Sequence, residues 1–241
     1  MSALEDSSFG RLFGVLASPA KTFRSIAERP TWVVVLVILA LLGSGISQLV
    51  NARTDQRKMI EKQMAKFGRQ LTPEQLEDAV QRAKNPPPVL RAVSVVVGVV
   101  FQVAFAYLLP TLLFFVFFKL SGSELTFKGA LSTYLHSSVP LMIGILLSIP
   151  VVLSRSTVEP VDALTGRLLA SGPAFFLPEG TSLALRGALS AFDIFNLWSV
   201  ALAIVGYRIV ARVSTTAATA AAVLLFLLGM GFRAGMAAFL G

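Results

Sequence analysis

The stretch GALSTYLHSSVPLMIGILLSIPVVLS, residues 129–154, carries no charged side chain, although Lys128 and Arg155 stand at its two ends. Similar uncharged runs cover residues 31–50, 92–118 and 213–232. A helix rises about 1.5 Å per residue, so roughly 20 apolar residues cross the ~30 Å hydrocarbon core of a bilayer. These runs predict a protein that crosses a membrane several times.

Composition supports that prediction. Hydrophobic residues make up 55% of the 241 residues, charged residues only 14%, and the mean hydropathy is +0.74. The formal net charge is +8, and the basic residues stand in short segments beside the apolar runs. We therefore expect anionic lipid headgroups as partners, and no nucleic acid. The basic residues would also help to set the orientation of the spans in the membrane.

We predict an all-α, polytopic bundle of five transmembrane helices, forming one domain over residues 31–241. The spans are expected at residues 31–50, 93–118, 130–153, 193–210 and 216–240. Pro110 is expected to kink the second span, and Pro140 and Pro150 lie inside the third. The first span follows a 30-residue polar and amphipathic segment and has full transmembrane length, so we do not expect a cleaved signal peptide.

Residues 1–30 form a separate amino-terminal segment. Within residues 8–27, apolar side chains recur at helical spacing, with basic side chains at other positions. The apolar set is Phe9, Leu12, Phe13, Leu16, Phe23 and Ile26. This pattern predicts an amphipathic helix at the membrane interface, kinked or divided at Pro19. Such a helix could merely anchor the bundle, sense anionic lipid or recruit a protein partner.

Two connecting segments differ in how clearly they can be interpreted. Residues 51–91 predict a helical hairpin on the membrane surface, whose second helix begins with the capping sequence Thr72-Pro73-Glu74-Gln75. Asn85 and the three prolines after it end that helix. Residues 154–191 contain turn signals around residues 174–177, a short apolar run that cannot cross a bilayer and is expected at the interface.

Two segments resemble prokaryotic Yip1-domain proteins. The first is LFGVLASPAKTFRSIAERPTW, residues 12–32, with Pro19, Phe23 and Pro30. The second is DIFNLW, residues 193–198, with Asp193, Phe195 and Trp198, followed by Gly206 and by Ser214 before an Ala-rich last span. The resemblance covers most of the chain.

This resemblance implies a five-helix fold with a cytoplasmic amino terminus and a carboxyl terminus on the opposite side of the membrane. Lys and Arg counts alone do not decide that orientation, because residues 51–91 are also rich in basic side chains. For eukaryotic members the resemblance implies binding to small prenylated GTPases and a role in vesicle trafficking. Those members carry a longer cytoplasmic amino-terminal region, and without one we do not expect GTPase binding here.

The polar residues inside the spans are the candidate site. Asp193 and Arg233 are predicted near the outer ends of spans four and five, where they could form an interhelical ion pair. In the alternative, Asp193 caps its helix and Arg233 reaches lipid phosphates alone. His136 and Tyr134 in span three could form a polar pocket with Tyr207 and Arg208, or His136 could simply bond a helix backbone.

The last span carries the small-residue pattern Gly231-x-x-x-Gly235. Such a pattern allows helices to approach closely. We expect the glycines to pack within the chain, with homo-oligomerisation as the alternative.

Three classes of function fit these observations. We favour a non-enzymatic integral protein of the cell membrane that acts through lipids or protein partners. A small transporter or channel that uses polar residues of spans three to five is the alternative, and a lipid-modifying enzyme ranks last. With one His and no Cys, we expect no catalytic, metal-binding or cofactor-binding residues.

Overall fold

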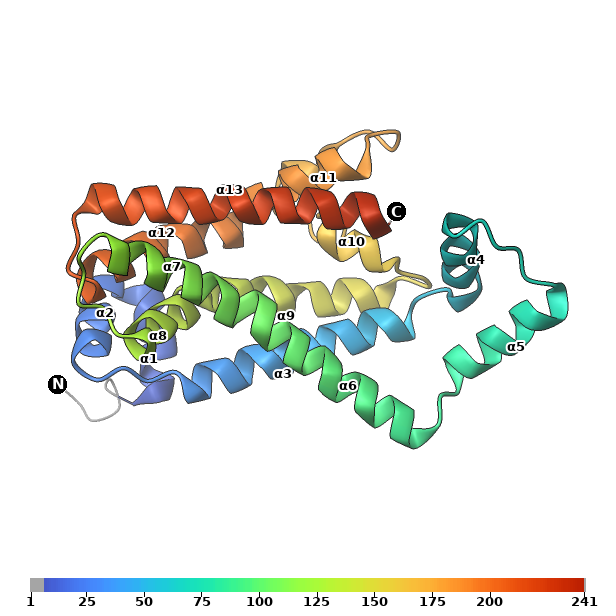
Figure 1. The fold of residues 1–241 in the computed structure, drawn as a ribbon, viewed down its shortest axis with the longest axis horizontal. Coiled ribbons are helices and arrows are strands. Elements are labelled where there is room, and N and C mark those ends of the chain that lie inside the picture. The colour runs from blue at the N-terminus through green and yellow to red at the C-terminus, as the bar shows by residue number, and fades with distance from the viewer. Residues whose placement is uncertain (1–6, 241) are drawn as a thin grey trace.

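A computed structural model describes residues 7–240, and within that range every regular element is helical. Most helices run along the long axis of the molecule, with the amino-terminal helices at one end and the carboxyl terminus at the other (Figure 1). The elements are α1 (Ser8–Ala17), α2 (Pro19–Glu28), α3 (Val33–Ala52), α4 (Gln56–Lys66), α5 (Pro73–Lys84), α6 (Pro88–Gln102), η1 (Val103–Leu108), α7 (Leu109–Leu120), α8 (Phe127–Ser137), α9 (Val139–Ser154), α10 (Pro160–Leu164), η2 (Pro173–Phe176), α11 (Leu183–Leu189), η3 (Ser190–Phe192), α12 (Ile194–Val210) and α13 (Thr215–Leu240).

Four helical stretches are long and apolar enough to cross a membrane. They are Val33–Ala52, Pro88–Leu120, Phe127–Ser154 and Thr215–Leu240. A fifth crossing is available if the pair Leu183–Phe192 and Ile194–Val210, bent by 51°, counts as one span. The structure thus has four or five candidate spans, each near a predicted one.

Proline shapes the second and third spans differently. In the second, the chain passes Pro110 without a break, and the preceding residues Val103–Leu108 adopt a π-helix in which Leu109 N–H donates to the Ala104 carbonyl. Proline has no N–H, so the carbonyl one turn before it loses its usual hydrogen-bond donor. A π-turn shifts the hydrogen-bond pattern so that nearby carbonyls can find other donors. In the third, α8 and α9 divide at Ser138, with Pro140 in the first turn of α9.

The amino-terminal segment forms two helices, because Pro19 begins α2 directly after Ser18 ends α1. Their apolar faces pack onto the bundle: Val15, Phe23 and Ile26 are fully buried. Arg11 is also buried and donates to the Arg29 carbonyl at 2.7 Å, Thr31 Oγ1 at 2.9 Å and Ser25 Oγ at 2.8 Å. The two helices therefore form an amino-terminal cap that is fixed to one end of the bundle.

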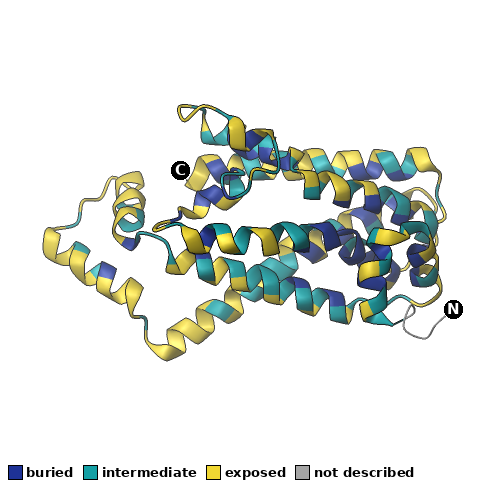
Figure 2. Ribbon diagram, turned by 180° about the vertical axis from the view of Figure 1, so that it is seen from behind, coloured by how far each residue is buried: buried dark blue, intermediate teal, exposed yellow. Residues whose placement is uncertain are grey.

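Helices α4 and α5 form the predicted hairpin, which projects from the opposite end of the bundle (Figure 1). The Thr72 hydroxyl accepts from Gln75 N–H at 3.2 Å and the Gln75 side chain accepts from Thr72 N–H at 3.0 Å, so the predicted capping box is present. Most of the hairpin is exposed (Figure 2), whereas Val80 of α5 is buried. Its location on a membrane surface stays a prediction.

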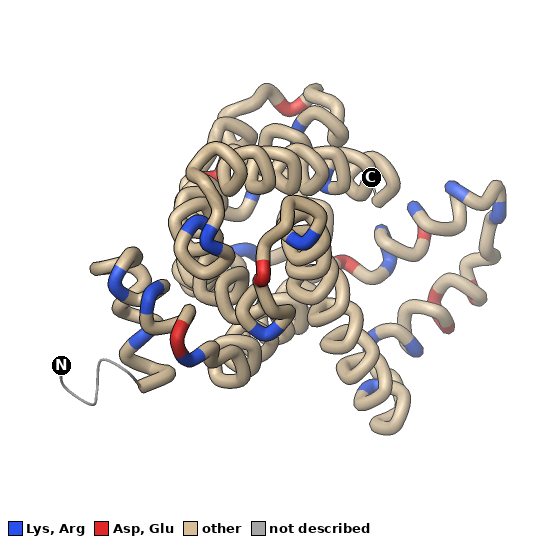
Figure 3. Tube along the Cα trace, turned by 60° about the vertical axis from the view of Figure 1, so that its left-hand side comes forward, with Lys and Arg blue, Asp and Glu red and all other residues tan. Residues whose placement is uncertain are grey.

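The core lies between the cap and the middle of the bundle. An aromatic cluster joins three helices: the Tyr207 ring of α12 lies 4.2 Å from the Phe114 ring and 5.2 Å from the Phe118 ring, both of α7. Ala130 of α8 is fully buried beside them and accepts a hydrogen bond from the Tyr207 hydroxyl at 3.0 Å. Charged residues gather at the cap, in the loops and on the hairpin (Figure 3).

Candidate functional site

Asp193 caps helix α12. Its Oδ1 accepts from Phe195 N–H at 2.9 Å and Asn196 N–H at 3.3 Å, and its Oδ2 accepts from the Ser171 hydroxyl. A carboxylate at this position satisfies amides at the helix start that have no partner within the helix. Asp193 therefore fixes the bend between η3 and α12 and ties it to the preceding loop.

Arg233 of α13 lies beside the same bend but bonds elsewhere. Its Nη1 donates to the Ser190 carbonyl at 3.2 Å and lies 3.5 Å from Ser190 Oγ. Among residues 7–240, no direct ion pair joins Arg233 to Asp193, although the carboxylate is near enough to attract the guanidinium group. The two side chains instead hold η3 from both sides, because the carboxylate is already used by amides and a hydroxyl.

The polar residues of α8 bond mainly to their own helix. His136 is fully buried, and its Nδ1 lies 2.8 Å from the Ser132 carbonyl, one turn earlier. The hydroxyls of Thr133, Ser137 and Ser138 donate to carbonyls four residues before them, at 2.8–2.9 Å. Such back-bonding satisfies a hydroxyl inside an apolar bundle and favours a bend in the helix, here the division at Ser138.

The predicted pocket around His136 and Tyr134 is only partly assembled. Tyr134 packs against the Phe114 ring with centroids 6.1 Å apart, and Tyr207 bonds Ala130, whereas Arg208 is exposed. The buried Nε2 of His136 makes no hydrogen bond. Contacts between helices are thus made here by Tyr134 and Tyr207, whereas the hydrogen bond of His136 stays within α8.

Two of the motif residues meet in the core. A Cβ at Gly206 would lie 2.7 Å from Thr133 Cγ2 and 2.8 Å from Phe23 Cε1. Phe23 is fully buried. Only glycine lets α12 approach both the cap and α8 this closely, so the distant motif segments form one packing site. Sequence reasoning named Gly206 and Phe23 but had no signal that they touch, and it missed Thr133.

Phe195 performs a similar role in α12. A Cβ on Gly144 of α9 would meet the Phe195 ring at 3.0 Å, so the aromatic side chain fills the place that a larger residue would take. Trp198, one turn further along α12, is 39% exposed and faces outward. Pro19 begins α2, and Pro30 lies in the link to α3.

The prediction that Gly231 and Gly235 pack within the chain is wrong. A Cβ at either position would meet nothing within 4 Å. Helix α13 instead makes a close contact with α11 through Ala237. A Cβ on Gly187 of α11 would lie 2.8 Å from the Ala237 Cβ. The sequence shows a stripe of small residues but not which neighbour, if any, covers it.

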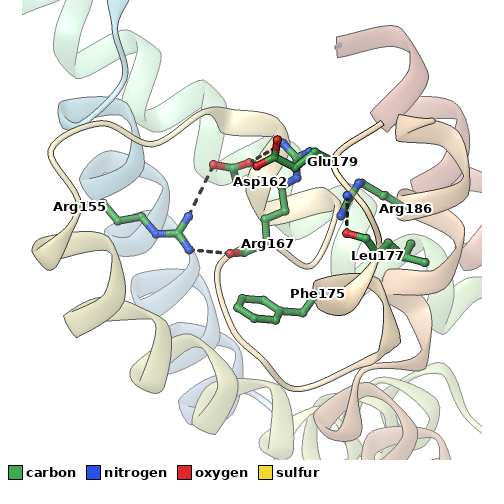
Figure 4. Close-up of a pocket in the computed structure, with 7 residues that line it drawn as sticks. All are labelled: Arg155, Asp162, Arg167, Phe175, Leu177, Glu179 and Arg186. Atoms are coloured by element: carbon green, nitrogen blue, oxygen red, sulfur yellow. Dashed lines mark hydrogen bonds and ion pairs between the residues drawn. The ribbon is translucent and has the colours of Figure 1, made fainter. Parts of the chain in front are cut away.

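Sequence reasoning did not identify a polar pocket in residues 155–186 (Figure 4). It has a volume of about 540 Å³ and is lined by Arg155, Asp162, Arg167, Phe175, Leu177, Glu179 and Arg186. Asp162 lies between two guanidinium groups, 3.8 Å from Arg155 Nη1 and 3.7 Å from Arg167 Nη1. Arg186, in the middle of an apolar helix, was the available signal, because a charge there needs buried partners.

A second, smaller groove of about 170 Å³ lies between α3 and α6. Gln102 crosses it: its Nε2 donates to the Leu39 carbonyl at 3.3 Å, and its Oε1 accepts from the Ser44 hydroxyl at 3.2 Å. Gly43 makes room for this side chain, since a Cβ there would lie 1.9 Å from Gln102 Nε2. Within residues 7–240, no group of three His, Asp or Glu side chains is placed to hold a metal ion.

Comparison with known proteins identifies a relative and a family. The chain is 28% identical to the membrane protein YknW of Bacillus subtilis over 216 residues, which covers 89% of this chain and 84% of that protein. No solved structure matches it. The Yip1 domain pattern matches residues 13–235, from the amino-terminal cap into the last helix. The chain therefore belongs to the Yip1-domain family of membrane proteins.

Proposed function

We propose that this Yip1-domain protein catalyses no reaction and acts as a membrane-embedded scaffold that binds lipids and protein partners. The observation that carries this proposal is the use of polar side chains within the spans. His136 and Thr133 bond carbonyls of their own helix, and Tyr207 bonds a carbonyl of α8, so these polar groups have partners inside the bundle. The bundle is thereby a rigid support for surfaces at its two ends.

The amino-terminal cap is the surface best suited to a partner. It is fixed by the buried Phe23, yet Phe9 and Phe13 on the other side of α1 are 61% and 74% exposed. Apolar side chains next to basic ones, such as Arg24, suit the boundary between lipid headgroups and acyl chains or an amphipathic partner helix. The cap can therefore make contacts without disturbing the bundle.

We further propose that the protein resides in the cell membrane with five crossings, a cytoplasmic amino terminus and a carboxyl terminus on the opposite side. The bent pair α11–η3–α12 would be the fourth crossing in chain order. In support, the two termini lie at opposite ends of the bundle (Figure 1).

Co-purification from crosslinked native membranes tests the scaffold proposal. The double variant Phe9→Ser, Phe13→Ser removes the exposed apolar face and keeps the buried one. We expect it to lose proteins that the unmodified chain retains. Phe67→Ser is the matched control, because Phe67 is also 74% exposed but lies beyond the end of the hairpin helix α4. Equal recovery of all proteins with the double variant would contradict a role for the cap.

A small transporter or channel is the second candidate, favoured by the groove between α3 and α6, which Gln102 crosses and which is lined in part by polar side chains. Ion and lipid flux through liposomes that contain the purified protein distinguishes the candidates. The scaffold proposal expects no flux above that of empty liposomes. Flux that Gln102→Leu, His136→Ala or Asp193→Asn abolishes would overturn it.

A further inference from the structure

The pocket in residues 155–186 lies where the spans end. Arg155 directly follows α9, which ends at Ser154, and Arg186 lies within α11, three residues after its start at Leu183. In a bundle whose helices cross the bilayer, the ends of the helices lie at the depth of the lipid headgroups. The pocket is thus at the level of the lipid phosphates in one leaflet.

Arg186 is buried at this pocket, with only 2% of its surface exposed. Its guanidinium donates to the carbonyls of Ala174 at 3.1 Å and Leu177 at 2.8 Å, and also to that of Pro178. Its Nε–H is buried and has no hydrogen-bond partner. Within residues 7–240, no carboxylate lies within ion-pair distance of Arg186, although Asp162 and Glu179 line the same pocket, so the hydrogen bonds of Arg186 go to backbone carbonyls.

Arg155 and Arg167 lie on the other side of the pocket, where Arg155 Nη2 donates to the Arg167 carbonyl at 2.7 Å (Figure 4). Their separations from Asp162, 3.8 and 3.7 Å, exceed the 2.7–3.2 Å of a good N–H···O hydrogen bond. Both side chains are about one-third exposed, at 33% and 34%. One carboxylate therefore holds two guanidinium groups in place and leaves N–H donors available to another anion.

The size of the pocket is sufficient for a lipid headgroup. Its volume of about 540 Å³ falls within the range of small-molecule sites. Phe175 and Leu177 add apolar surface beside the three arginines (Figure 4). Guanidinium groups bind phosphate through paired hydrogen bonds, and an adjacent apolar wall would accommodate the glycerol and upper acyl region of a lipid.

We propose that Arg155, Arg167 and Arg186 form a binding site for a phosphate group, supplied by an anionic phospholipid headgroup. Asp162 acts as a built-in competitor, because its carboxylate occupies the guanidinium groups that the phosphate would engage. This site deepens the proposed function by naming one lipid contact, and it lies at the end of the bundle opposite the cap.

The thermal unfolding of the purified full chain in detergent, titrated with short-chain probes, tests the site. Binding to the folded state raises the unfolding midpoint, and the rise grows with the ratio of free ligand concentration to Kd. We expect dihexanoyl-phosphatidylglycerol to raise it and dihexanoylglycerol, which lacks phosphate, to leave it unchanged. In Arg167→Gln the affinity for the phospholipid should fall about tenfold, the effect of losing one charge-assisted contact. Arg82→Gln, an exposed hairpin arginine at the same end of the molecule, should behave like the unmodified chain.

Further probes and variants distinguish the possible outcomes. If inorganic phosphate raises the unfolding midpoint as much as the phospholipid does, the result would support the phosphate site and assign it to a soluble ligand. An equal response from Arg167→Gln and the unmodified chain, or no response to any phosphate probe, would overturn the proposal. If Arg167→Gln does not fold, Asp162→Asn decides: removing the competing carboxylate should tighten phospholipid binding several-fold, and unchanged or weaker binding would count against the site. The double cap variant Phe9→Ser, Phe13→Ser leaves this site intact. Failure of the phosphate-site proposal can therefore be distinguished from failure of the scaffold proposal.

Discussion

At the scale of single residues, glycine and aspartate determine how the helices meet. The structure shows why position 206 is a glycine: a larger side chain there would collide with Phe23 and Thr133. Asp193 was predicted either to cap α12 or to pair with Arg233, and the hydrogen bonds show the cap. A sequence can thus single out an important residue without showing which residue it contacts.

We predict that Gly206→Val destabilises the bundle by about 1–3 kcal/mol, because the new methyl groups must displace the Phe23 ring and Thr133. Reversible unfolding in mixed detergent micelles measures the change. Gly231→Ala is the control, and it should leave the free energy of unfolding the same or raise it by up to about 1 kcal/mol, since its Cβ meets nothing. Equal losses from both variants would show that the close approach at Gly206 does not matter.

We predict that Asp193→Ala costs about 0.5–2 kcal/mol of stability, and Asp193→Asn clearly less, because asparagine also caps helices well. The same unfolding assay compares the two. If the side-chain charge mattered through Arg233 instead, Asn would be as damaging as Ala. That result would restore the ion pair that the geometry does not show.

At the scale of elements, the uncharged runs predicted the positions of the four long apolar helices, because hydrophobic length is a property of the local sequence. The capping box of α5 was also predictable, since its residues are adjacent in the chain. The loop of residues 155–186 was not, because Asp162 acquires its role only when folding brings two arginines to it. The outward face of Gly231 and Gly235 was mispredicted for the same reason.

We predict that Phe23→Ala loosens the amino-terminal cap. Phe23 is fully buried between α2 and α12, and removing such a ring costs roughly 3–5 kcal/mol. Hydrogen exchange should therefore accelerate across α1 and α2 and remain slow in α13. Phe13→Ala, at a side chain that is 74% exposed, should change little. Unaltered exchange in the cap of Phe23→Ala would mean that other contacts hold it.

We predict that Thr72→Ala affects only the hairpin. Loss of the capping box should cost about 1 kcal/mol locally, so amides in the first turn of α5 should exchange roughly fivefold faster. Because the hairpin projects from the bundle, the thermal midpoint of the whole protein should stay unchanged (Figure 1). A clear fall of that midpoint would show that the hairpin supports the bundle.

At the scale of the whole molecule, the central claim is that the bent pair α11–η3–α12 crosses the membrane and makes the number of crossings odd. The chain has no Cys, so single cysteines can report which side of the membrane a residue faces. Exposed positions are available at both ends of the bundle: Glu28, Ser121 and Thr216 at the cap end, and Gln63 and Glu179 at the hairpin end.

The decisive measurement is labelling of these five cysteine variants in intact cells with a membrane-impermeant maleimide. With a cytoplasmic amino terminus, Gln63→Cys and Glu179→Cys should be labelled from outside, and the other three only after the membrane is opened. Labelling of Glu179→Cys and Thr216→Cys from the same side would show that α12 does not cross, and would contradict the five-span arrangement.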